Sequence, residues 1–385
     1  MANLKVLDVI DSGGLYGAEV MLLHLVAEQI RQGIEPIIAS IGEKGIEEKP
    51  LETEAKKRGF RVEKFRMMPG PNFPGASKIL RFAWSDGVNI LHSHGYKGNI
   101  LLGFIPKPIR RIPIITTVHG YTSRVNGFNR MRLYEWLDSR ALGLMDAVVF
   151  VSNAMKSDPH FRHLCPEKVN VIHNGIPLTP DEAQALNSDH DSQNLDSILE
   201  FCKKGYIIGS IGRLSPEKGY ENLIRALAHV VNKGLDARLL LIGQGALKEK
   251  LVLLASELGL TSRIMFAGYQ KAAFRFFHLM NVFVISSLTE GLPMTLLEAM
   301  RAKVPIIATR VGGIPDILTD PKDAILLPPK DEEGLASAIL RISCNPEKTL
   351  QMTENAYKKF KSELSSYKMA KQYSSLYKEL LRRDR

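Results

Sequence analysis

Short apolar runs, separated by segments of helical composition, recur along the chain and constrain its fold more than any other feature. Residues 113–118, 206–211 and 282–285 are typical, because each is rich in β-branched residues and too short for a buried helix. A strand that is apolar on both faces belongs in a parallel sheet covered by helices on both sides. We therefore expect an α/β protein built from repeated strand–helix units.

The apolar runs form two series, separated by a polar stretch. The expected strands are residues 4–10, 36–41, 61–65, 88–91, 113–118, 146–152 and 169–172, then 206–211, 237–242, 263–267, 282–285, 304–308 and 324–327. Residues 179–196 are polar, acidic and without periodicity, as is typical of linkers, and residues 69–75 are expected to form a loop. This pattern predicts domains at 1–178 and 204–360, a linker at 179–203, and a terminal segment at 361–385 that contains a helix from residue 365.

The order of the strands matters for function. If the second series takes the order 3-2-1-4-5-6, its first and fourth strands are neighbours at the switch point, where open α/β sheets bind ligands. The loop after residue 211 would then face the loop after residue 285.

Composition excludes several classes of protein. With 385 residues, 45% hydrophobic and 24% charged, the chain is long enough for two cores. No run approaches the roughly 20 apolar residues that cross a bilayer, and the first ten residues have a strand pattern rather than that of a signal peptide, so we expect a cytoplasmic protein. Cys165, Cys202 and Cys344 are far apart and lack metal-ligand spacing, so we expect neither a disulfide nor zinc.

The net charge is +10, and the first 178 residues carry 23 Lys and Arg against 17 Asp and Glu. No aromatic-interleaved basic motif, helix-turn-helix or zinc-finger spacing is present, so nucleic acid is the least favoured partner. A dispersed solvated surface is the ordinary interpretation of such an excess. A basic surface for anionic lipid remains open.

The stretch from 286 to 316 has the features of a phosphate site. A strand ends at residue 285, Pro293 stands where a first helical residue would, and good helix formers follow, so free backbone NH groups near residues 294–296 attract anions. Glu290 precedes this helix and Glu298 lies within it. Two acids flanking a surface helix are common, but Gly312-Gly313 adds a turn that suits a backbone lying close to a ligand.

Glu290 and Glu298 with seven residues between them, Gly-Leu-Pro after the first, Leu-Glu-Ala-Met around the second and the Gly-Gly turn resemble a known family. It is the retaining glycosyltransferases of the GT-B fold, more specifically the large family four group. The resemblance implies two Rossmann-like, doubly wound parallel-sheet domains facing a central cleft, and a terminal helix that packs back on the N-terminal domain. It also implies transfer of a sugar from a nucleotide diphosphate to an acceptor hydroxyl.

Three further segments match the family. Gly-Arg-Leu…Glu-Lys-Gly around Arg213 and Lys218 implies two cations for the donor diphosphate, and Thr-Val-His-Gly implies that His119 lies against the donor sugar. The loop Ser12-Gly13-Gly14 follows the first strand, as a phosphate loop does. We expect His119, Arg213, Lys218 and Glu290 to act in catalysis. The residues expected to bind the donor are Gly13, Gly14, Gly212, Gly291, Leu292, Pro293, Thr295, Leu296 and Glu298.

Metals and cofactors are not expected. His92 and His94 have a spacing that could hold a metal, but no third ligand follows nearby, so they are interpreted as structural. The nucleotide sugar is a substrate, and the family match implies no metal. The segment 173–177 resembles the family's Pro-Asn-Gly-Ile-Asp except for His173 and Pro177, which leaves the hinge undefined.

Other functions remain open. A sugar-nucleotide epimerase shares this fold but needs an acid–base pair in the first domain's loops, where none is convincing. A non-catalytic binder of sugar nucleotides would be expected to lack one of the four catalytic residues, and a nucleic-acid or scaffold protein would leave them unexplained.

The acceptor is expected to be a sugar or a lipid-linked acceptor. Residues 104–111 carry Lys107, Arg110 and Arg111 beside apolar residues, which predicts contact with an anionic membrane surface, although a solvated loop explains them equally well.

Overall fold

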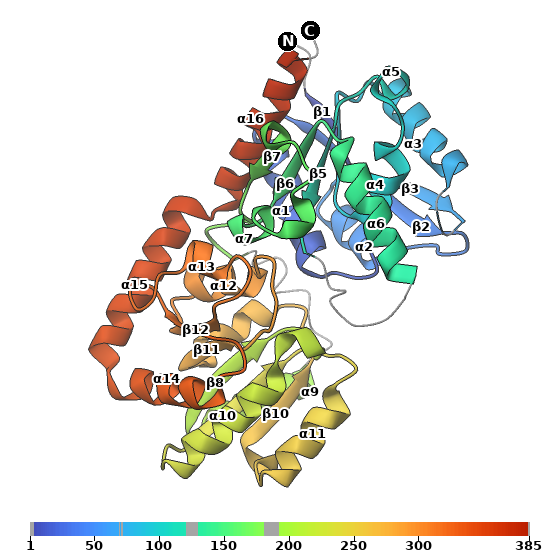
Figure 1. Cartoon of the computed structure of the whole chain (residues 1–385). Helices are drawn as coiled ribbons and strands as arrows, with labels where there is room; N and C mark the ends of the chain where they lie inside the picture. The colour runs from blue at the N-terminus through green and yellow to red at the C-terminus, as the bar shows by residue number, and fades with distance from the viewer. Residues whose placement is uncertain (1–3, 69, 71, 121–129, 181–191, 384–385) are drawn as a thin grey trace. The chain divides into compact units, whose positions relative to one another are not determined.

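The computed structural model describes residues 4–68, 70, 72–120, 130–180 and 192–383. The chain divides into two compact units (Figure 1). Unit 1 contains residues up to Ile176 together with those from Ser366 onward, and unit 2 runs from Pro177 to Ser365. Each unit is a parallel sheet with helices packed on both faces, as the continuous apolar strands predict.

Unit 1 has a seven-stranded sheet in the order β3-β2-β1-β4-β5-β6-β7. The strands are β1 Lys5–Asp11, β2 Glu35–Glu43, β3 Val62–Met67, β4 Ile90–Ser93, β5 Ile114–Val118, β6 Ala147–Phe150 and β7 Val169–Val171. The α-helices are α1 Gly17–Arg31, α2 Pro50–Lys57, α3 Phe73–Ser85, α4 Tyr96–Gly103, α5 Lys107–Arg110, α6 Arg130–Gly143, α7 Asn153–Lys156 and α16 Ser366–Arg383. All seven expected strands of this half are present.

Unit 2 has a six-stranded sheet in the order β10-β9-β8-β11-β12-β13. The strands are β8 Tyr206–Ile211, β9 Ala237–Ile242, β10 Ile264–Gly268, β11 Val282–Ile285, β12 Ile306–Thr309 and β13 Ile325–Leu327. The α-helices are α9 Ser192–Cys202, α10 Tyr220–Asn232, α11 Lys248–Glu257, α12 Met294–Arg301, α13 Ile314–Ile317, α14 Glu332–Cys344 and α15 Pro346–Glu363. This is the predicted order 3-2-1-4-5-6, so β8 and β11 are paired neighbours.

Side chains from both sheet faces and the covering helices form the cores. In unit 1 one cluster joins Leu7, Leu91 and Phe150 to α3, α4 and α6, and a second cluster joins Ile38 to α1 and α2. In unit 2 the main cluster packs β8, β9 and β11 against α10 and α14. The sheets are therefore buried on both faces, which leaves their strand ends to carry polar groups.

The structure corrects the prediction of a loop at 69–75, of which residues 69 and 71 lie outside the described part. Phe73, Pro74 and Gly75 form the first turn of α3. Asn72 caps this helix, since its side-chain oxygen accepts a hydrogen bond of 2.8 Å from the Gly75 NH. Pro and Gly are typical of turns, but Pro is also tolerated in the first turn of a helix, and here the Asn cap decides.

Within the expected linker, residues 192–202 form α9, whereas residues 181–191 lie outside the described part. The terminal helix α16 belongs to unit 1 and packs on α1 (Figure 1). Met369, Tyr373 and Tyr377 on its inner face are buried.

The segment 104–111 differs from its expectation in one residue. Arg110 is 1% exposed, and its guanidinium is 2.6 Å from Asp146 Oδ2 and 2.7 Å from the Ile112 carbonyl oxygen. Arg110 is thus a core cation and contributes nothing to a basic surface. Lys107 and Arg111 are exposed, as is Ile109.

Candidate functional site

A small pocket in unit 2 opens where β8 and β11 end side by side. It is lined by Ser210, Ile211, Lys218, Tyr220, Ile285, Ser286, Ser287, Glu290 and Thr295. The pocket lies at the switch point of the sheet, because the chain leaves β8 and β11 towards opposite neighbours. Three of the predicted site residues, Lys218, Glu290 and Thr295, therefore meet here.

An ion pair joins the two loops of this pocket. Lys218 Nζ lies 2.6 Å from Glu290 Oε1, and the Ser287 hydroxyl donates to the same oxygen at 2.6 Å. The Ser286 hydroxyl donates to the Lys218 carbonyl oxygen at 2.9 Å. The two side chains of the pair are 21% and 9% exposed, so a ligand could still reach the ammonium group.

Glycines allow the loops after β8, β11 and β12 to lie close together at this pocket. Gly219, directly after Lys218, has φ 61°, and a Cβ there would lie 2.3 Å from the Ser286 carbonyl oxygen. Gly312 has φ 54°, and a Cβ there would lie 2.0 Å from the Glu290 carbonyl oxygen. Any other residue at either position would push one loop away. The Gly313 NH also donates to the Gly291 carbonyl oxygen at 2.6 Å, which ties the Gly-Gly turn to the Glu290 loop.

Arg213 lies on the same loop as Lys218, but its side chain is more exposed to solvent. Its side chain is 51% exposed, and its Nη2 lies 3.0 Å from Glu217 Oε1. Glu217 in turn accepts a hydrogen bond of 2.7 Å at its carbonyl oxygen from the Leu288 NH. Gly212 precedes Arg213 and packs against Tyr220, whose hydroxyl would be 2.8 Å from a Cβ at this position.

The helix expected after the Glu290 loop is α12. Pro293 was predicted to be its first helical residue but is its N-cap, so the helix begins one position later, at Met294. The side chains of Leu292 and Leu296 are buried in the core, so only their backbone could face a ligand. Thr295 is the side chain of this first turn that lines the pocket.

Glu298 lies one turn further along α12 and does not line the pocket. Burial raises the pKa of Glu298 to about 7, and the positive charge of Arg301 opposes the shift. Some of its surface remains accessible, whereas that of Ala299 and Met300 is buried. Glu298 is thus a carboxyl group that is partly protonated near neutral pH.

The glycine loop of unit 1 follows β1. The Ser12 hydroxyl donates to the Gly14 carbonyl oxygen at 2.6 Å, which closes a tight turn. A Cβ at Gly14 would lie 2.8 Å from the Tyr16 ring, while Gly13 has open space around it. Gly13 is therefore the position where a ligand could approach the backbone of this loop.

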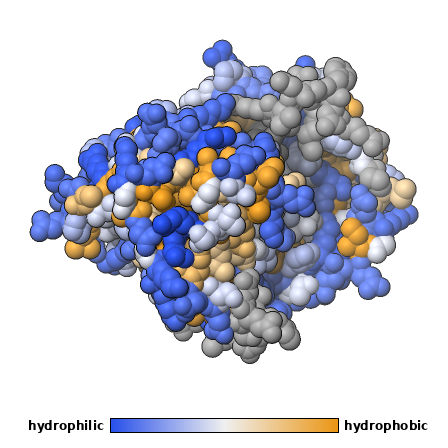
Figure 2. Space-filling model, turned by 90° about the horizontal axis from the view of Figure 1, so that it is seen from below, coloured by the Kyte–Doolittle hydropathy of each residue, from blue (hydrophilic) through white to orange (hydrophobic). Residues whose placement is uncertain are grey.

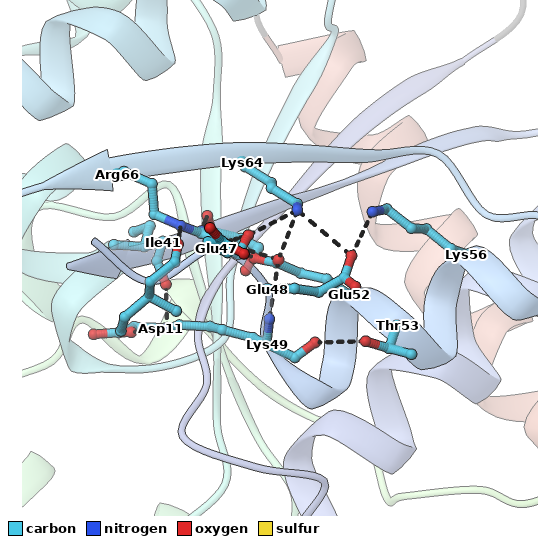
Figure 3. Close-up of polar contacts among 12 residues, drawn as sticks. Asp11, Ile41, Glu47, Glu48, Lys49, Glu52, Thr53, Lys56, Lys64 and Arg66 are labelled. Carbon is cyan, nitrogen blue, oxygen red and sulfur yellow. Dashed lines mark hydrogen bonds and ion pairs between the residues drawn. The ribbon is translucent and has the colours of Figure 1, made fainter. Parts of the chain in front are cut away.

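A charged cluster supports the sheet edge next to this loop (Figure 3). Lys49 Nζ lies 2.8 Å from Asp11 Oδ1, and Lys97 Nζ lies 2.8 Å from Asp11 Oδ2. The fully buried Glu52 carboxylate holds the Arg66 guanidinium at 2.7 and 2.8 Å. Each of these charges has an opposite partner, so the cluster stabilises the ends of β1, β2 and β3.

His119 directly follows β5 in unit 1. Burial lowers the pKa of His119 well below its ordinary value, with help from the neighbouring His94 and His92. Its ring stacks on His94 with centroids 5.8 Å apart, and its Nε2 is buried without a hydrogen-bond partner within the described residues. A neutral imidazole with a free nitrogen can receive a hydrogen bond from a ligand hydroxyl.

Asp8 supplies the third group that was not expected beside His92 and His94. Ligand atoms of the three residues lie within 4.8 Å of one another. Both nitrogens of His92 already have protein partners, however, at 2.8 Å from Tyr377 Oη and 2.8 Å from Thr117 Oγ1. The two imidazole centroids are only 3.9 Å apart, and this close packing favours a hydrogen-bonded cluster over a metal centre. The sequence signal for it was an acid inside an apolar strand.

Two family models match the chain. The model "Glycosyltransferase Family 4" matches residues 16–179, and the model "Glycosyl transferases group 1" matches residues 191–359. Together they span both units of the structure. The chain belongs to the group 1, family 4-like glycosyltransferases of the GT-B fold.

Relatives and solved structures agree with this assignment. N-acetyl-alpha-D-glucosaminyl L-malate synthase of Bacillus anthracis is 26% identical over 312 residues, which cover 80% of each chain. UDP-Gal:alpha-D-GlcNAc-diphosphoundecaprenol alpha-1,3-galactosyltransferase of Escherichia coli is 24% identical and covers 77% of this chain and 76% of its own. The structure of Anabaena HepE in complex with UDP-glucose superimposes with a TM-score of 0.81 at 19% identity, covering 98% of this chain and 100% of that chain. At this identity the superposition shows a shared fold.

The raised pKa of Glu298 predicts a pH-dependent stability. Because the folded pKa is about 7 against an ordinary 4.5, the folded state holds this proton through a window in which the unfolded state loses it. The free energy of unfolding should therefore fall as the pH rises through this window. Glu298→Gln should remove that fall and gain about 1 to 3 kcal/mol over wild type at pH 8. Urea unfolding at pH 5, 7 and 8 measures the free energy of unfolding of both proteins. If this free energy changed with pH by the same amount in wild type and in Glu298→Gln, the raised pKa of Glu298 would be contradicted.

Proposed function

We propose that the protein transfers a sugar, with retention of anomeric configuration, from a nucleotide-diphosphate sugar to an acceptor hydroxyl. The observation that carries this proposal is the Lys218–Glu290 pair at the end of β8 and β11, beside the first turn of α12. A point cation and free helix NH groups suit a diphosphate, and a carboxylate beside them suits sugar hydroxyls. Anabaena HepE, which shares the fold, binds UDP and UDP-glucose.

The chemical step breaks the bond between the anomeric carbon and the donor phosphate oxygen. The acceptor oxygen attacks from the face that the phosphate leaves, and its proton passes to the departing phosphate. Lys218 and Arg213 would stabilise the negative charge that grows on that phosphate, with the backbone NH groups of Met294 and Thr295. These fixed positive groups can do this without a metal ion, so we propose a metal-independent transfer.

The two glutamates and His119 would bind the remaining parts of the donor. Glu290 is already ion-paired with Lys218, so its second oxygen is the group available to sugar hydroxyls. Glu298 lies inside α12, and its side chain leans towards the amino end of the helix, where it can reach ribose hydroxyls. His119 offers its free Nε2 to a hydroxyl of the transferred sugar.

Replacing Lys218 by Ala tests the proposed chemistry. We expect turnover to fall about 10²-fold or more, because a positive charge aimed at the leaving phosphate is lost. Nucleotide release from a panel of UDP- and GDP-sugars identifies the donor and measures the rate. Lys250→Ala is the matched control, since it removes an exposed cation paired with Glu221 in the same unit. Near-normal turnover in folded Lys218→Ala would exclude Lys218 from catalysis.

A binding experiment distinguishes the roles proposed for Glu290 and Glu298. Glu298→Ala should weaken binding of the bare nucleoside diphosphate, because it loses a ribose contact. Glu290→Ala should reduce transfer much more than it reduces that binding. Calorimetry with UDP and GDP on both variants decides the point, and an equal loss of nucleotide affinity would reverse the assignment.

For the acceptor we propose a sugar or lipid-linked sugar in the synthesis of a cell-surface polysaccharide or glycolipid. The galactosyltransferase relative acts on a diphosphoundecaprenol-linked sugar. None of the helices in the described part of the chain is long and apolar enough to cross a bilayer. We propose that the protein meets such an acceptor at the cytoplasmic surface of the membrane.

Unit 1 has an exposed surface that suits such contact, which we call the α5–α6 surface. Its exposed apolar residues are Phe104, Ile109, Leu133, Trp136 and Leu144, and its exposed cations are Lys107, Arg111 and Arg140. The two segments are adjacent, because a Cβ at Gly103 would lie 3.3 Å from that of Ala141. Arg140 also stacks over Trp136 at 5.4 Å. Hydrophilic residues cover much of the face shown in Figure 2, with hydrophobic residues in smaller areas between them.

Cosedimentation with anionic vesicles tests the α5–α6 surface. Each Lys or Arg near an anionic surface adds about 1 kcal/mol before salt screening, so binding should be reversible and should weaken at high salt. Changing Lys107, Arg111 and Arg140 to Gln should abolish it. Changing Lys248, Lys250 and Lys322, which are exposed in unit 2, is the matched control. Binding that ignores lipid charge, or that survives the first triple change, would leave a soluble acceptor.

A further inference from the structure

A row of buried polar side chains crosses the central strands of unit 1. Asp8 on β1, His92 on β4 and Thr117 on β5 are each 0% exposed, and His94, just after β4, is 4% exposed. The three strands are neighbours in the order β1-β4-β5. Their other buried positions are mostly apolar, so the row is exceptional in this sheet. Burying charged and polar groups costs folding free energy that apolar side chains would avoid.

The row forms one continuous hydrogen-bonded network. Asp8 Oδ1 lies 2.9 Å from His94 Nε2 and 3.2 Å from His92 Nδ1. Burial acts to raise the pKa of Asp8, yet the hydrogen bonds from the two imidazoles outweigh it and hold this pKa below its ordinary value. Burial lowers the pKa of His92 to about 4, so His92 is neutral at physiological pH. Asp8 is thus an ionised carboxylate whose orienting contacts are imidazoles.

The C-terminal helix completes this network. The Tyr377 hydroxyl lies 2.8 Å from His92 Nδ1, and the Tyr373 hydroxyl lies 2.8 Å from Thr117 Oγ1. Gln29 of α1 donates to the Tyr377 hydroxyl at 3.2 Å. Both tyrosine rings are buried against the His92 ring, with centroids 5.1 and 5.8 Å away. The two hydroxyls therefore hold the row at its middle, on β4, and at its β5 end.

His119 lies next to the β5 end of the row. Thr117 and His119 are two positions apart at the end of β5, so their side chains share one face of the sheet. The His119 ring rests on His94, whose Nε2 is bound to Asp8, and in the described residues it has no hydrogen bond to its own Nε2. Among the described residues, the contact that can orient His119 at this side of its ring is therefore the packing against His94.

We propose that Asp8 and His94 are positioning residues for His119, and that α16 keeps them in place through its tyrosine hydroxyls. Asp8 fixes the His94 ring by accepting its Nε2–H, and the fixed ring orients His119 towards the sugar. The Tyr377 and Tyr373 hydroxyls prevent the His92 and Thr117 side chains from turning away. The catalytic role of the network rests on the proposed sugar transfer. The effect of the network on the orientation of the His119 ring does not depend on that function.

Two variants test the proposal, Asp8→Asn and Tyr377→Phe, each of which keeps the shape of the side chain. Ser374→Ala is the matched control, because it removes a hydroxyl of the same helix that donates to Gln32 Oε1, just after α1, at 2.8 Å and lies outside the network. We expect kcat to fall about tenfold in both network variants, with the KM for the donor within about twofold, since a misplaced binding group affects the transition state most. Ser374→Ala should keep the wild-type kcat.

Histidine nuclear magnetic resonance gives a second readout that needs no activity. The His119 ring signals should shift in Asp8→Asn and Tyr377→Phe, with the protein still folded, and should stay unchanged in Ser374→Ala. Unchanged His119 signals in a folded Tyr377→Phe protein, or an equal loss of kcat in Ser374→Ala, would overturn the proposal. If wild type transferred no sugar from any donor, the proposed function would fall, and the resonance shifts would still decide whether the network positions His119.

Discussion

The contact between Lys218 and Glu290 determines the geometry of the candidate site in unit 2. It joins the loops that follow the adjacent parallel strands β8 and β11, which come close because Gly219 has no side chain. Gly312 in turn lets the loop after β12 pack against the Glu290 loop. A partly buried pair of this kind adds little net stability, because desolvating the two charges offsets most of their attraction. Its value is geometric: it holds an ammonium group and a carboxylate beside the first turn of α12. The helix, the glycines and the pair therefore form one arrangement, in which changing any part would move the others.

The two units place their charged and polar side chains in different environments. Unit 2 places its charges at the open end of the sheet, where a ligand can exchange with an existing partner. Unit 1 buries Asp8, His92 and Thr117 within the sheet. The imidazoles of His92 and His94 contact Asp8, and hydroxyls from α16 contact His92 and Thr117. An open site allows the electrostatics to change when a substrate arrives, whereas a buried network resists change and keeps its members in one arrangement. A transferase that binds a charged donor and aligns a neutral sugar needs both kinds of environment.

Much of the fold could be predicted because burial on both faces makes a strand a continuous apolar run. All the strands appeared in the expected places, and the strand order of unit 2 brought Lys218 and Glu290 together as predicted. Local patterns failed where a distant residue decides the outcome. Arg110 looked like a surface cation until Asp146, 36 positions away, was placed beside it. Asp8 could not be linked to His92 and His94 without knowing that β1 and β4 pair. Glu298 carried no sign in its neighbours that burial would raise its pKa.

The return of α16 to unit 1 has a consequence for how the protein is made. Unit 1 consists of two parts of the chain, and the whole of unit 2 is synthesised between them. Until α16 leaves the ribosome, the sheet that contains Asp8, His92 and Thr117 lacks the tyrosine hydroxyls and the helix that cover it. Unit 2 is continuous in sequence and has its own core, so it can fold before α16 has packed on unit 1. The residues of β1 are therefore made long before α16 but reach their final environment only after it, and a chain cut short before α16 would leave the polar row uncovered in the middle of the sheet.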